Sequence, residues 1–359
     1  MSVLSVITVA FMVVVAALLL LRTLAGAFGL IDKPGGRKMH QGHIPVVGGL
    51  AMTVGFVMAS VAAGRLPHSQ FVLLLLGVFM AGLGALDDRF DVPPKVRLFA
   101  HVSAALVLVF GTQTTVSSLG DLLGWGDLQL GWFATPFTVV AVVALINAYN
   151  MLDGLDGLAA GCGLVALGGM LWIGGAAGGA PGLTLIGALF GAVVAFALFN
   201  MPLHFNKPLR TFMGDAGSTL LGFLLAGLSL SFIQPHADGS TIAPVTILWL
   251  MPLPIFELFG TTVRRLVQGI PLAVADAGHF HHRLADKGLS VRAICALYVV
   301  VSLASAVAGI YMASHGVPQQ IMFLGYLVLA ALWMALLSQA QVIAQSGPAW
   351  ARRPSPPAA

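Results

Sequence analysis

Apolar segments recur along the whole of this 359-residue chain, and they restrict its fold more than any other feature. Each is long enough to cross a hydrocarbon layer of about 30 Å as a helix. Hydrophobic residues make up 58% of the sequence and charged residues only 8%, which excludes an ordinary soluble domain. The sequence therefore predicts an all-α integral membrane protein.

Length and hydropathy predict about eleven transmembrane helices in one polytopic bundle. Their approximate bounds are Val3–Leu21, Val46–Ala63, Phe71–Leu86, Leu98–Gly111, Trp132–Ile146, Leu158–Gly175, Leu183–Asn200, Ser218–Ile233, Ile242–Phe259, Ala293–Ser314 and Ile321–Gln339. Residues 1–345 are expected to form one transmembrane domain with its active site on the cytoplasmic face. The stretch 346–359 is rich in Pro and Ala, which predicts a disordered tail.

Basic residues predict the orientation of the bundle, because cytoplasmic loops carry an excess of Lys and Arg. If Lys33, Arg37 and Lys38 are cytoplasmic, alternation of the spans places nearly every other basic residue on the same side. We therefore expect the amino end outside and the carboxyl end in the cytoplasm. Because the basic residues lie in short loops between spans, the net charge of +4 does not indicate a nucleic-acid partner.

Five polar islands interrupt the apolar sequence, and the same alternation places all of them on the cytoplasmic side. They are Asp32–His43, Asp87–Arg97, Asn147–Asp156, His204–Asp215 and Arg264–Lys287. Charged groups at the edge of a membrane cost free energy unless a cation, a partner or water satisfies them. A functional role is therefore the first expectation for each island. After the first island, Gly48 and Gly49 permit either the close approach of a ligand or tight helix packing.

The second island opens with three acids within five residues: Asp87, Asp88 and Asp91. An adjacent pair of aspartates suits Mg²⁺, which takes one or two carboxylates and keeps water and phosphate as its other ligands. The alternative is an interfacial loop in which Arg89, Lys95 and Arg97 balance the acids.

The third and fourth islands each hold aspartates next to glycine. Asp153 and Asp156 are three residues apart, and each precedes a glycine. Helix capping is the alternative, although it explains one of the two more easily than both. Asp215 follows Gly214 at the start of a new apolar segment with Ser and Thr in its first turn. That pattern is typical of an oxygen-ligand or phosphate site at a helix N-terminus, and capping by Asp215 is again the alternative.

The fifth island contains three histidines within four residues: His279, His281 and His282. A zinc site is the weaker hypothesis, because no cysteine or second histidine cluster completes a tetrahedral set. Together with Arg264, Arg265 and Arg283, these histidines favour recognition of an anionic ligand. Glu257 is a weaker candidate, for which a pair with Arg264 or Arg265 is the simple expectation.

Acids suited to Mg²⁺ and basic residues suited to phosphate, beside a lipid phase, suggest phosphoryl transfer from a soluble compound to a membrane lipid. The same residues resemble the polyprenyl-phosphate N-acetylhexosamine-1-phosphate transferase family. The resemblance runs from Asp32 to Leu289 and covers the motifs Pro-x-x-Gly-Gly, Leu-Asp-Asp-Arg-Phe-Asp, Asn-Ala-Tyr-Asn-Met-Leu-Asp-Gly-Leu-Asp-Gly, Phe-Met-Gly-Asp-Ala-Gly-Ser and His-Phe-His-His-Arg. Because Phe280 interrupts the histidines, the chain looks like the branch that uses UDP-N-acetylglucosamine. Branches for phospho-MurNAc-pentapeptide or another UDP-N-acetylhexosamine are the alternatives.

The resemblance implies that a polyprenyl phosphate attacks the β-phosphorus of a UDP-N-acetylhexosamine, giving a lipid-linked sugar pyrophosphate and UMP. It also implies Mg²⁺ as cofactor, with Mn²⁺ as a possible substitute, held by Asp215 and Asp153. The implied catalytic residues are Asp87, Asp88, Asp153 and Asp156. The implied substrate-binding residues are Asn150, Lys95, Arg264, Arg265, His279, His281, His282 and Arg283.

Direct transfer is the expected mechanism, because a phosphate monoester with a second pKa of about 6 is mostly dianionic at pH 7 and needs no base. A covalent or basic role for Asp87 is the alternative. The expected location is the bacterial inner membrane, where the product would start O-antigen or another cell-surface glycan, and a homodimer is possible. A transporter is the alternative of a different class, but transporter acids typically lie near the midplane of the bilayer.

Overall fold

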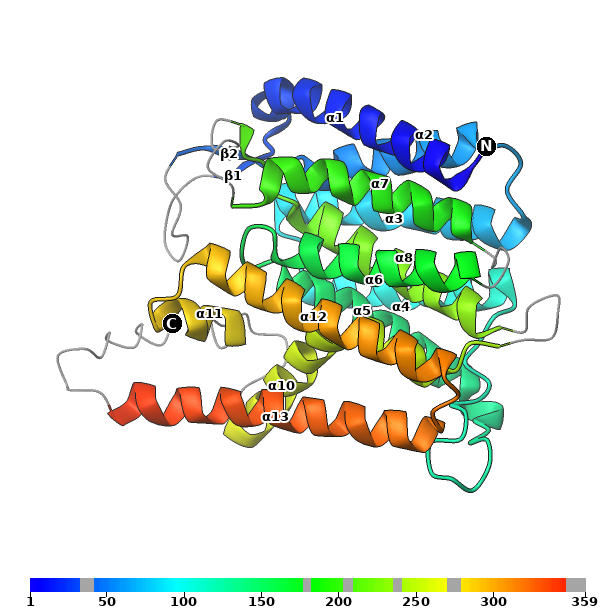
Figure 1. Ribbon diagram of the computed structural model, residues 1–359. Coiled ribbons are helices and arrows are strands. Elements are labelled where there is room, and N and C mark those ends of the chain that lie inside the picture. Colours follow the sequence, from blue (N-terminus) through cyan, green and yellow to red (C-terminus); the bar gives the residue numbers. More distant parts are fainter. Residues whose placement is uncertain (33–41, 177–181, 203–208, 235–240, 270–278, 347–359) are drawn as a thin grey trace.

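The computed structural model describes residues 1–32, 42–176, 182–202, 209–234, 241–269 and 279–346. Helices make up most of it (Figure 1), as the composition predicts. The short strands β1 (Ile31–Asp32) and β2 (Ile44–Pro45) form one antiparallel pair. The predicted tail beyond residue 346 lies outside the described residues. So do the basic residues from which the orientation of the bundle was predicted, Lys33, Arg37 and Lys38.

Every one of the predicted apolar segments is helical. The long helices are α1 (Val3–Phe28), α3 (His68–Phe90), α4 (Pro94–Thr112), α5 (Ala134–Leu152, preceded by the 3₁₀ turn η1, Gly131–Phe133), α6 (Leu158–Ala176), α7 (Leu183–Asn200), α8 (Gly214–Ile233), α12 (Val291–Ser314) and α13 (Gln319–Ser346). In the part of the chain that is described, these nine are long and apolar enough to cross a membrane. The fold class is therefore confirmed.

The other two predicted spans differ from simple transmembrane helices. Helix α2 (Gly48–Ala62) has only 15 residues. The ninth predicted span is a pair, α9 (Pro244–Leu250) and α10 (Pro252–Gln268), whose axes differ by 88°. Pro252 at the start of α10 has no N–H to continue the hydrogen bonds of α9, so the chain breaks there.

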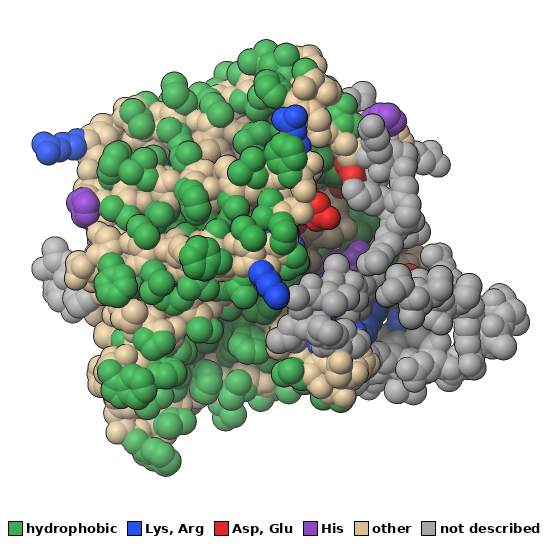
Figure 2. Space-filling view, turned by 180° about the vertical axis from the view of Figure 1, so that it is seen from behind, with side chains coloured by type: hydrophobic (Ala, Val, Ile, Leu, Met, Phe, Trp, Pro, Cys, Tyr) green, Lys and Arg blue, Asp and Glu red, His purple; other side chains and the backbone are tan. Residues whose placement is uncertain are grey.

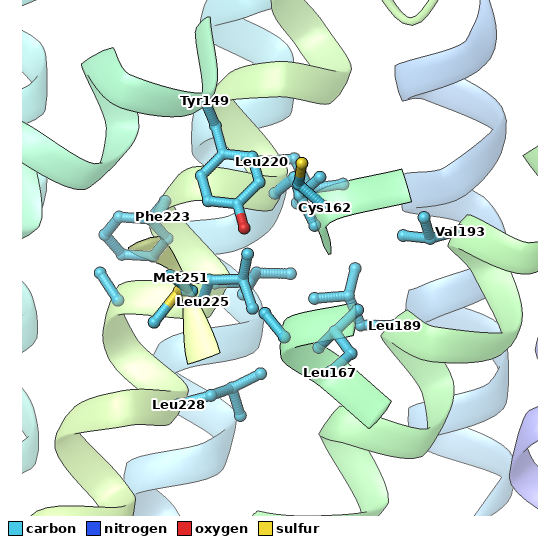
Figure 3. Packing of buried hydrophobic residues seen from close by; sticks show 14 of the residues in the cluster. Tyr149, Cys162, Leu167, Leu189, Val193, Leu220, Phe223, Leu225, Leu228 and Met251 are labelled. Atoms are coloured by element: carbon cyan, nitrogen blue, oxygen red, sulfur yellow. The ribbon is translucent and has the colours of Figure 1, made fainter. Parts of the chain in front are cut away.

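Helix α8 lies at the centre of the bundle. Within its most apolar stretch 83% of the residues are buried, against 17% for α13 at the periphery. Leu220, Phe223 and Leu228 of α8 pack among apolar side chains of the neighbouring helices (Figure 3). Glycines bring other helices close to its first turn, since a Cβ on Gly49 would lie 2.1 Å from the Gly217 nitrogen. Gly48 and Gly49 therefore serve helix packing, one of the two roles expected for them.

The described residues of the polar islands lie at one end of the bundle, which we call the polar end. It holds the strand pair, the last turn of α3, the first turn of α8 and the short helix α11 (Phe280–Asp286), on the left in Figure 1. Helix α1 begins at the opposite end, whereas α13 ends at the polar end. Figure 2 shows an apolar flank, and the acidic side chains of described residues that are visible on this face lie toward the polar end. This grouping agrees with the expectation that one face holds the chemistry.

Candidate active site

The last turn of α3 places Asp87 against the first turn of α4. One carboxylate oxygen of Asp87 accepts the Val92 backbone N–H at 2.8 Å, and the other lies 2.5 Å from an Arg97 guanidinium nitrogen. The side chain of Asp87 is buried. Both oxygens are thus already used, so Asp87 is held as a charged partner of Arg97.

Asp88 caps a different helix from its own. Its two oxygens accept the backbone N–H groups of Asp215 at 2.8 Å and Ala216 at 3.1 Å, at the start of α8. Gly214 makes this approach possible: its φ is +71°, and a Cβ there would lie 2.5 Å from the Asp88 carboxylate. A negative charge is favourable at a helix N-terminus. The cap of α8 is therefore Asp88 rather than Asp215, so the capping alternative for Asp215 is wrong.

Asp215 is released from capping and is held by side chains from two other helices. Asn150 of α5 donates its amide N–H to Asp215 Oδ1 at 2.5 Å and also reaches the Ser218 hydroxyl at 3.1 Å. The Arg97 guanidinium lies 3.9 Å from Asp215 Oδ2, and no described residue donates a hydrogen bond to that oxygen. One oxygen of Asp215 thus remains available to a ligand.

The loop after α5, residues 153–157, carries the other two aspartates. The Asp153 side chain is partly buried and makes no hydrogen bond or ion pair with the described residues. Burial raises the pKa of Asp153 well above its usual value, and the nearby charges of Asp215, Asp88 and Asp156 raise it further. These repulsions indicate that the carboxylates of α3, α8 and this loop lie near one another. We call Asp87, Asp88, Asp153, Asp156 and Asp215 the carboxylate cluster.

Asp156 is balanced by a basic residue from a different polar island. Its carboxylate forms an ion pair with Arg210. The loop is fixed from the same side, because Asn200 accepts the Gly157 N–H at 2.8 Å and donates to the Thr211 carbonyl at 3.0 Å. Asn200, at the end of α7, therefore ties the residue before α6 to the segment that precedes α8.

A ready-made metal centre is not present among the described residues, since no three His, Cys, Asp or Glu side chains converge on one point. Asp153 and Asp215 are nevertheless suitable ligands for a cation. Asp153 has no described partner, and Asp215 keeps one oxygen without a hydrogen bond. Carboxylate oxygens are the donors that Mg²⁺ prefers, so the residues present fit this ion.

The histidines of the fifth island lie at the start of α11 and face the loop 153–157. The rings of His279 and His281 are stacked, with centroids 5.5 Å apart, and His282 packs against His281 at 4.4 Å. A Cβ on Gly154 would lie 2.6 Å from His281 Nε2 and 3.3 Å from His282 Nε2. Two histidines thus contact the loop of Asp153 and Asp156, which are more than 120 residues away in sequence.

The remaining predicted binding residues are less closely gathered. Lys95 is exposed and makes no polar contact with the described residues. Arg264 and the buried Arg265 lie on α10, where Arg264 reaches Gln268 at 3.4 Å, and Arg283 lies on α11. The expectation for Glu257 is wrong: it bonds to Tyr298 and to the Phe280 backbone N–H rather than to either arginine.

Three residues make more contacts within the site than the sequence indicated. The sequence indicated for Arg97 only a balancing charge, yet its guanidinium forms ion pairs with both Asp87 and Asp215. Arg210 and Asn200 received no role, although both hold the loop of Asp156. A lone Asn at the end of an apolar segment, as at Asn150, is the signal that could have identified Asn200.

Comparison with known proteins identifies the family of the chain. Residues 70–233, which contain the whole carboxylate cluster, match glycosyl transferase family 4. The chain is 33% identical over 333 residues to the undecaprenyl-phosphate alpha-N-acetylglucosaminyl 1-phosphate transferase of Escherichia coli K12, covering 90% of this chain and 88% of that protein. The protein of the same name from Salmonella typhi is 34% identical, with coverages of 91% and 88%. A probable undecaprenyl-phosphate N-acetylglucosaminyl 1-phosphate transferase of Bacillus subtilis is 31% identical, covering 82% of each chain. The chain therefore belongs to glycosyl transferase family 4.

Proposed function

We propose that this protein transfers N-acetylglucosamine 1-phosphate from UDP-N-acetylglucosamine to undecaprenyl phosphate and releases UMP. The observation that carries the proposal is the convergence of Asp88, Asn150, Asp153 and Asp215 at one end of a membrane bundle. Charged donors and lipid acceptors can meet there. The names of the relatives support the sugar and the lipid.

Asp153 and Asp215 would hold Mg²⁺ or, as a substitute, Mn²⁺. When bound, the ion would neutralise charge on the phosphates of the donor. Asn150 orients Asp215 through its 2.5 Å hydrogen bond, and Asp88 orients the backbone of the same turn. Arg97 and Arg210 hold Asp87 and Asp156 in place through ion pairs.

Direct transfer is the mechanism that the contacts support. An oxygen of the acceptor phosphate bonds to the β-phosphorus of the donor, the bond from that phosphorus to the bridging oxygen breaks, and UMP leaves with that oxygen. Asp87 is a poor candidate for a nucleophile or a base, because Val92 and Arg97 already occupy both of its oxygens. Positioning and charge neutralisation then supply the catalysis. Isolation of an aspartyl-phosphate at Asp87 without acceptor lipid would contradict this mechanism.

We assign the donor side to α11 and to the end of α10. His281 and His282 contact the loop of Asp153, and the arginines at 264, 265 and 283 lie on the same two helices. Cationic and hydrogen-bonding groups of this kind suit a sugar pyrophosphate. The exposed Lys95 would then act only in the approach of an anionic substrate.

We further propose that residues 1–345 form a single catalytic domain in a bacterial inner membrane, with the polar end in the cytoplasm. UDP-sugars are soluble, so the site must face the compartment that holds them. The product would start the assembly of O-antigen or another cell-surface glycan. The described carboxylate cluster comes from one chain, so a homodimer, if formed, need not complete it.

The direct test is UMP release by purified protein in lipid vesicles with Mg²⁺ and undecaprenyl phosphate. We expect release with UDP-N-acetylglucosamine and none with UDP-MurNAc-pentapeptide. Release with the pentapeptide donor alone would place the protein in the other branch. A transporter would release no UMP with either donor, and an inactive Asp215→Ala variant that still inserts into membranes controls for contaminating enzymes.

A further inference from the structure

Glu257 is the only glutamate in the sequence. It is a buried residue of α10 and is not part of the carboxylate cluster. Only 2% of its surface is exposed. One oxygen accepts the hydroxyl of Tyr298 on α12, and the other accepts the Phe280 backbone N–H at 3.2 Å, at the start of α11. Glu257 therefore joins α10, α11 and α12 at one point.

His281 is the other polar group beside Glu257. Its Nδ1 lies 3.8 Å from Glu257 Oε1, and its exposed surface is 0%. No described residue forms a hydrogen bond with either ring nitrogen. The opposite nitrogen, Nε2, points at Gly154, where a Cβ would lie only 2.6 Å away. The ring thus stands between the carboxylate of Glu257 and the loop of Asp153.

Helix α11 is fixed by further contacts around this pair. Thr261 lies one turn after Glu257 on α10, and its hydroxyl oxygen is 3.2 Å from His279 Nδ1. Phe280 packs edge-on against Trp333 of α13, with ring centroids 4.6 Å apart. The position of α11 between α10, α12 and α13 is visible in Figure 1. These contacts fix the backbone of α11 near His281, whereas the orientation of the His281 ring depends on the groups around the imidazole.

Anchoring of α11 alone does not explain a carboxylate at this position. The hydroxyl of Tyr298 and the N–H of Phe280 are neutral, and a glutamine could meet both: its amide oxygen would accept the Phe280 N–H, and its NH2 would donate to the Tyr298 hydroxyl oxygen. A buried charge is costly unless a group of opposite charge compensates it. The only titratable nitrogen base that faces Glu257 among the described residues is the imidazole of His281.

We propose that Glu257 is a positioning residue for catalysis, and that it acts through His281. The carboxylate orients the ring so that Nδ1–H faces Glu257 and Nε2 faces the loop 153–157. There Nε2 packs against Gly154 and holds the turn that carries Asp153 in the position that binds the donor. This inference rests on the proposed function, because it assigns the partner of His281 within the same site.

A double-mutant cycle in vesicles tests the proposal. We expect Glu257→Gln to lower kcat for UMP release about 10- to 100-fold, as loss of an orienting partner does elsewhere, with the donor KM within about threefold of the wild type. In a His281→Ala background the same substitution should cost no more than about twofold, because the residue through which it acts is gone. Losses that multiply, or an unchanged kcat in Glu257→Gln, would overturn the proposal.

Tyr326→Phe is the matched control for removal of a buried polar group in this region. Tyr326 lies on α13 against Phe256, and its hydroxyl has no hydrogen-bond partner among the described residues. Its activity should equal that of the wild type. The unfolding temperature of every variant is measured in parallel, so that a misfolded variant is recognised.

A readout independent of activity separates this inference from the proposed function. If wild-type protein releases no UMP, the proposed function fails, and hydrogen exchange at the imidazole C2 atoms then decides the fate of the inference. Glu257→Gln should speed exchange at His281 and leave exposed His315, at the far end of α12, unchanged. Equal exchange at His281 in both proteins would show that Glu257 does not hold the ring.

Discussion

The two groups of polar side chains at the polar end use their charges in different ways. In the carboxylate cluster, backbone N–H groups and arginines hold Asp87, Asp88 and Asp156, while Asp153 has no described partner. Around α11, both carboxylate oxygens of Glu257 accept hydrogen bonds from other residues of the protein. The first group thus keeps a carboxylate without a described partner, whereas the carboxylate of the second is fully used in contacts between helices. Substitutions in the two should therefore differ in kind.

The largest effect is expected for Asp215→Asn in the carboxylate cluster. Loss of a metal-binding carboxylate removes several kcal/mol of charge stabilisation, so kcat should fall on the order of a thousandfold. UMP release at saturating donor and Mg²⁺ measures it. Asp121→Asn is the control, because Asp121 caps the loop at Gly124 and Gly126 at the opposite end of the bundle. If Asp215→Asn kept a tenth of the activity, the cluster would not hold the metal.

A smaller effect on activity, joined to a loss of stability, is expected for Asp88→Asn. The amide has one acceptor oxygen and no charge, so it caps α8 poorly. We expect the free energy of unfolding to drop by about 1 kcal/mol and kcat to fall about 10- to 100-fold. Thermal unfolding in detergent and UMP release measure the two effects. Asp91→Asn is a suitable control, since Asp91 is an exposed C-cap with φ of +52°, which Asn also tolerates.

The contact between the two groups is tested by Gly154→Ala. The added Cβ must displace His281 Nε2, which lies 2.6 Å from its position, and this weakens the coupling between histidine and loop. We expect kcat/KM for the donor to fall about tenfold, with an unchanged KM for undecaprenyl phosphate. In α6, Gly175→Ala is the control, because no described atom lies within 4 Å of that added Cβ. Equal kinetics in both variants would disprove a functional contact.

The smallest effect is the pH dependence of stability that Asp153 contributes. Its pKa is raised in the folded protein by burial and by the neighbouring carboxylates, so the folded state binds the proton more tightly than the unfolded state. Without metal, stability should therefore fall as pH rises from about 4, the pKa of a free aspartate, to the raised pKa. Unfolding temperatures between pH 4.5 and 8 in EDTA measure this slope. Asp153→Asn should flatten it, and saturating Mg²⁺ should reduce it in the wild type. An identical slope in the variant would contradict this origin.

The sequence predicts the fold class and the positions of the helices because both depend on local hydropathy. A segment is apolar enough to cross a membrane or it is not, and its neighbours hardly change that. The break at Pro252 was missed, since the mean hydropathy of the predicted span Ile242–Phe259 does not register a bend. The polar islands could be located from the sequence as well, because charged residues are so few that each island is distinct from the apolar segments around it.

The pairing of those residues could not be predicted. Asp88 caps a helix that starts 126 residues later, and Asn150 reaches Asp215 across 65 positions. Glu257 was paired with the nearest arginines along its own helix, whereas its true partners lie on α11 and α12. Such contacts depend on how each helix is rotated about its axis and which neighbour it meets.

The sequence by itself determined that this protein is a helical membrane bundle whose few charged residues are grouped in a small number of polar islands. It did so because burial of charge in an apolar phase is so costly that composition alone reveals where charges are needed. Only the tertiary structure decided which carboxylates are already satisfied and which remain open to a ligand. That distinction rests on distances of a few ångströms between helices, and the packing of small residues around α8 sets those distances.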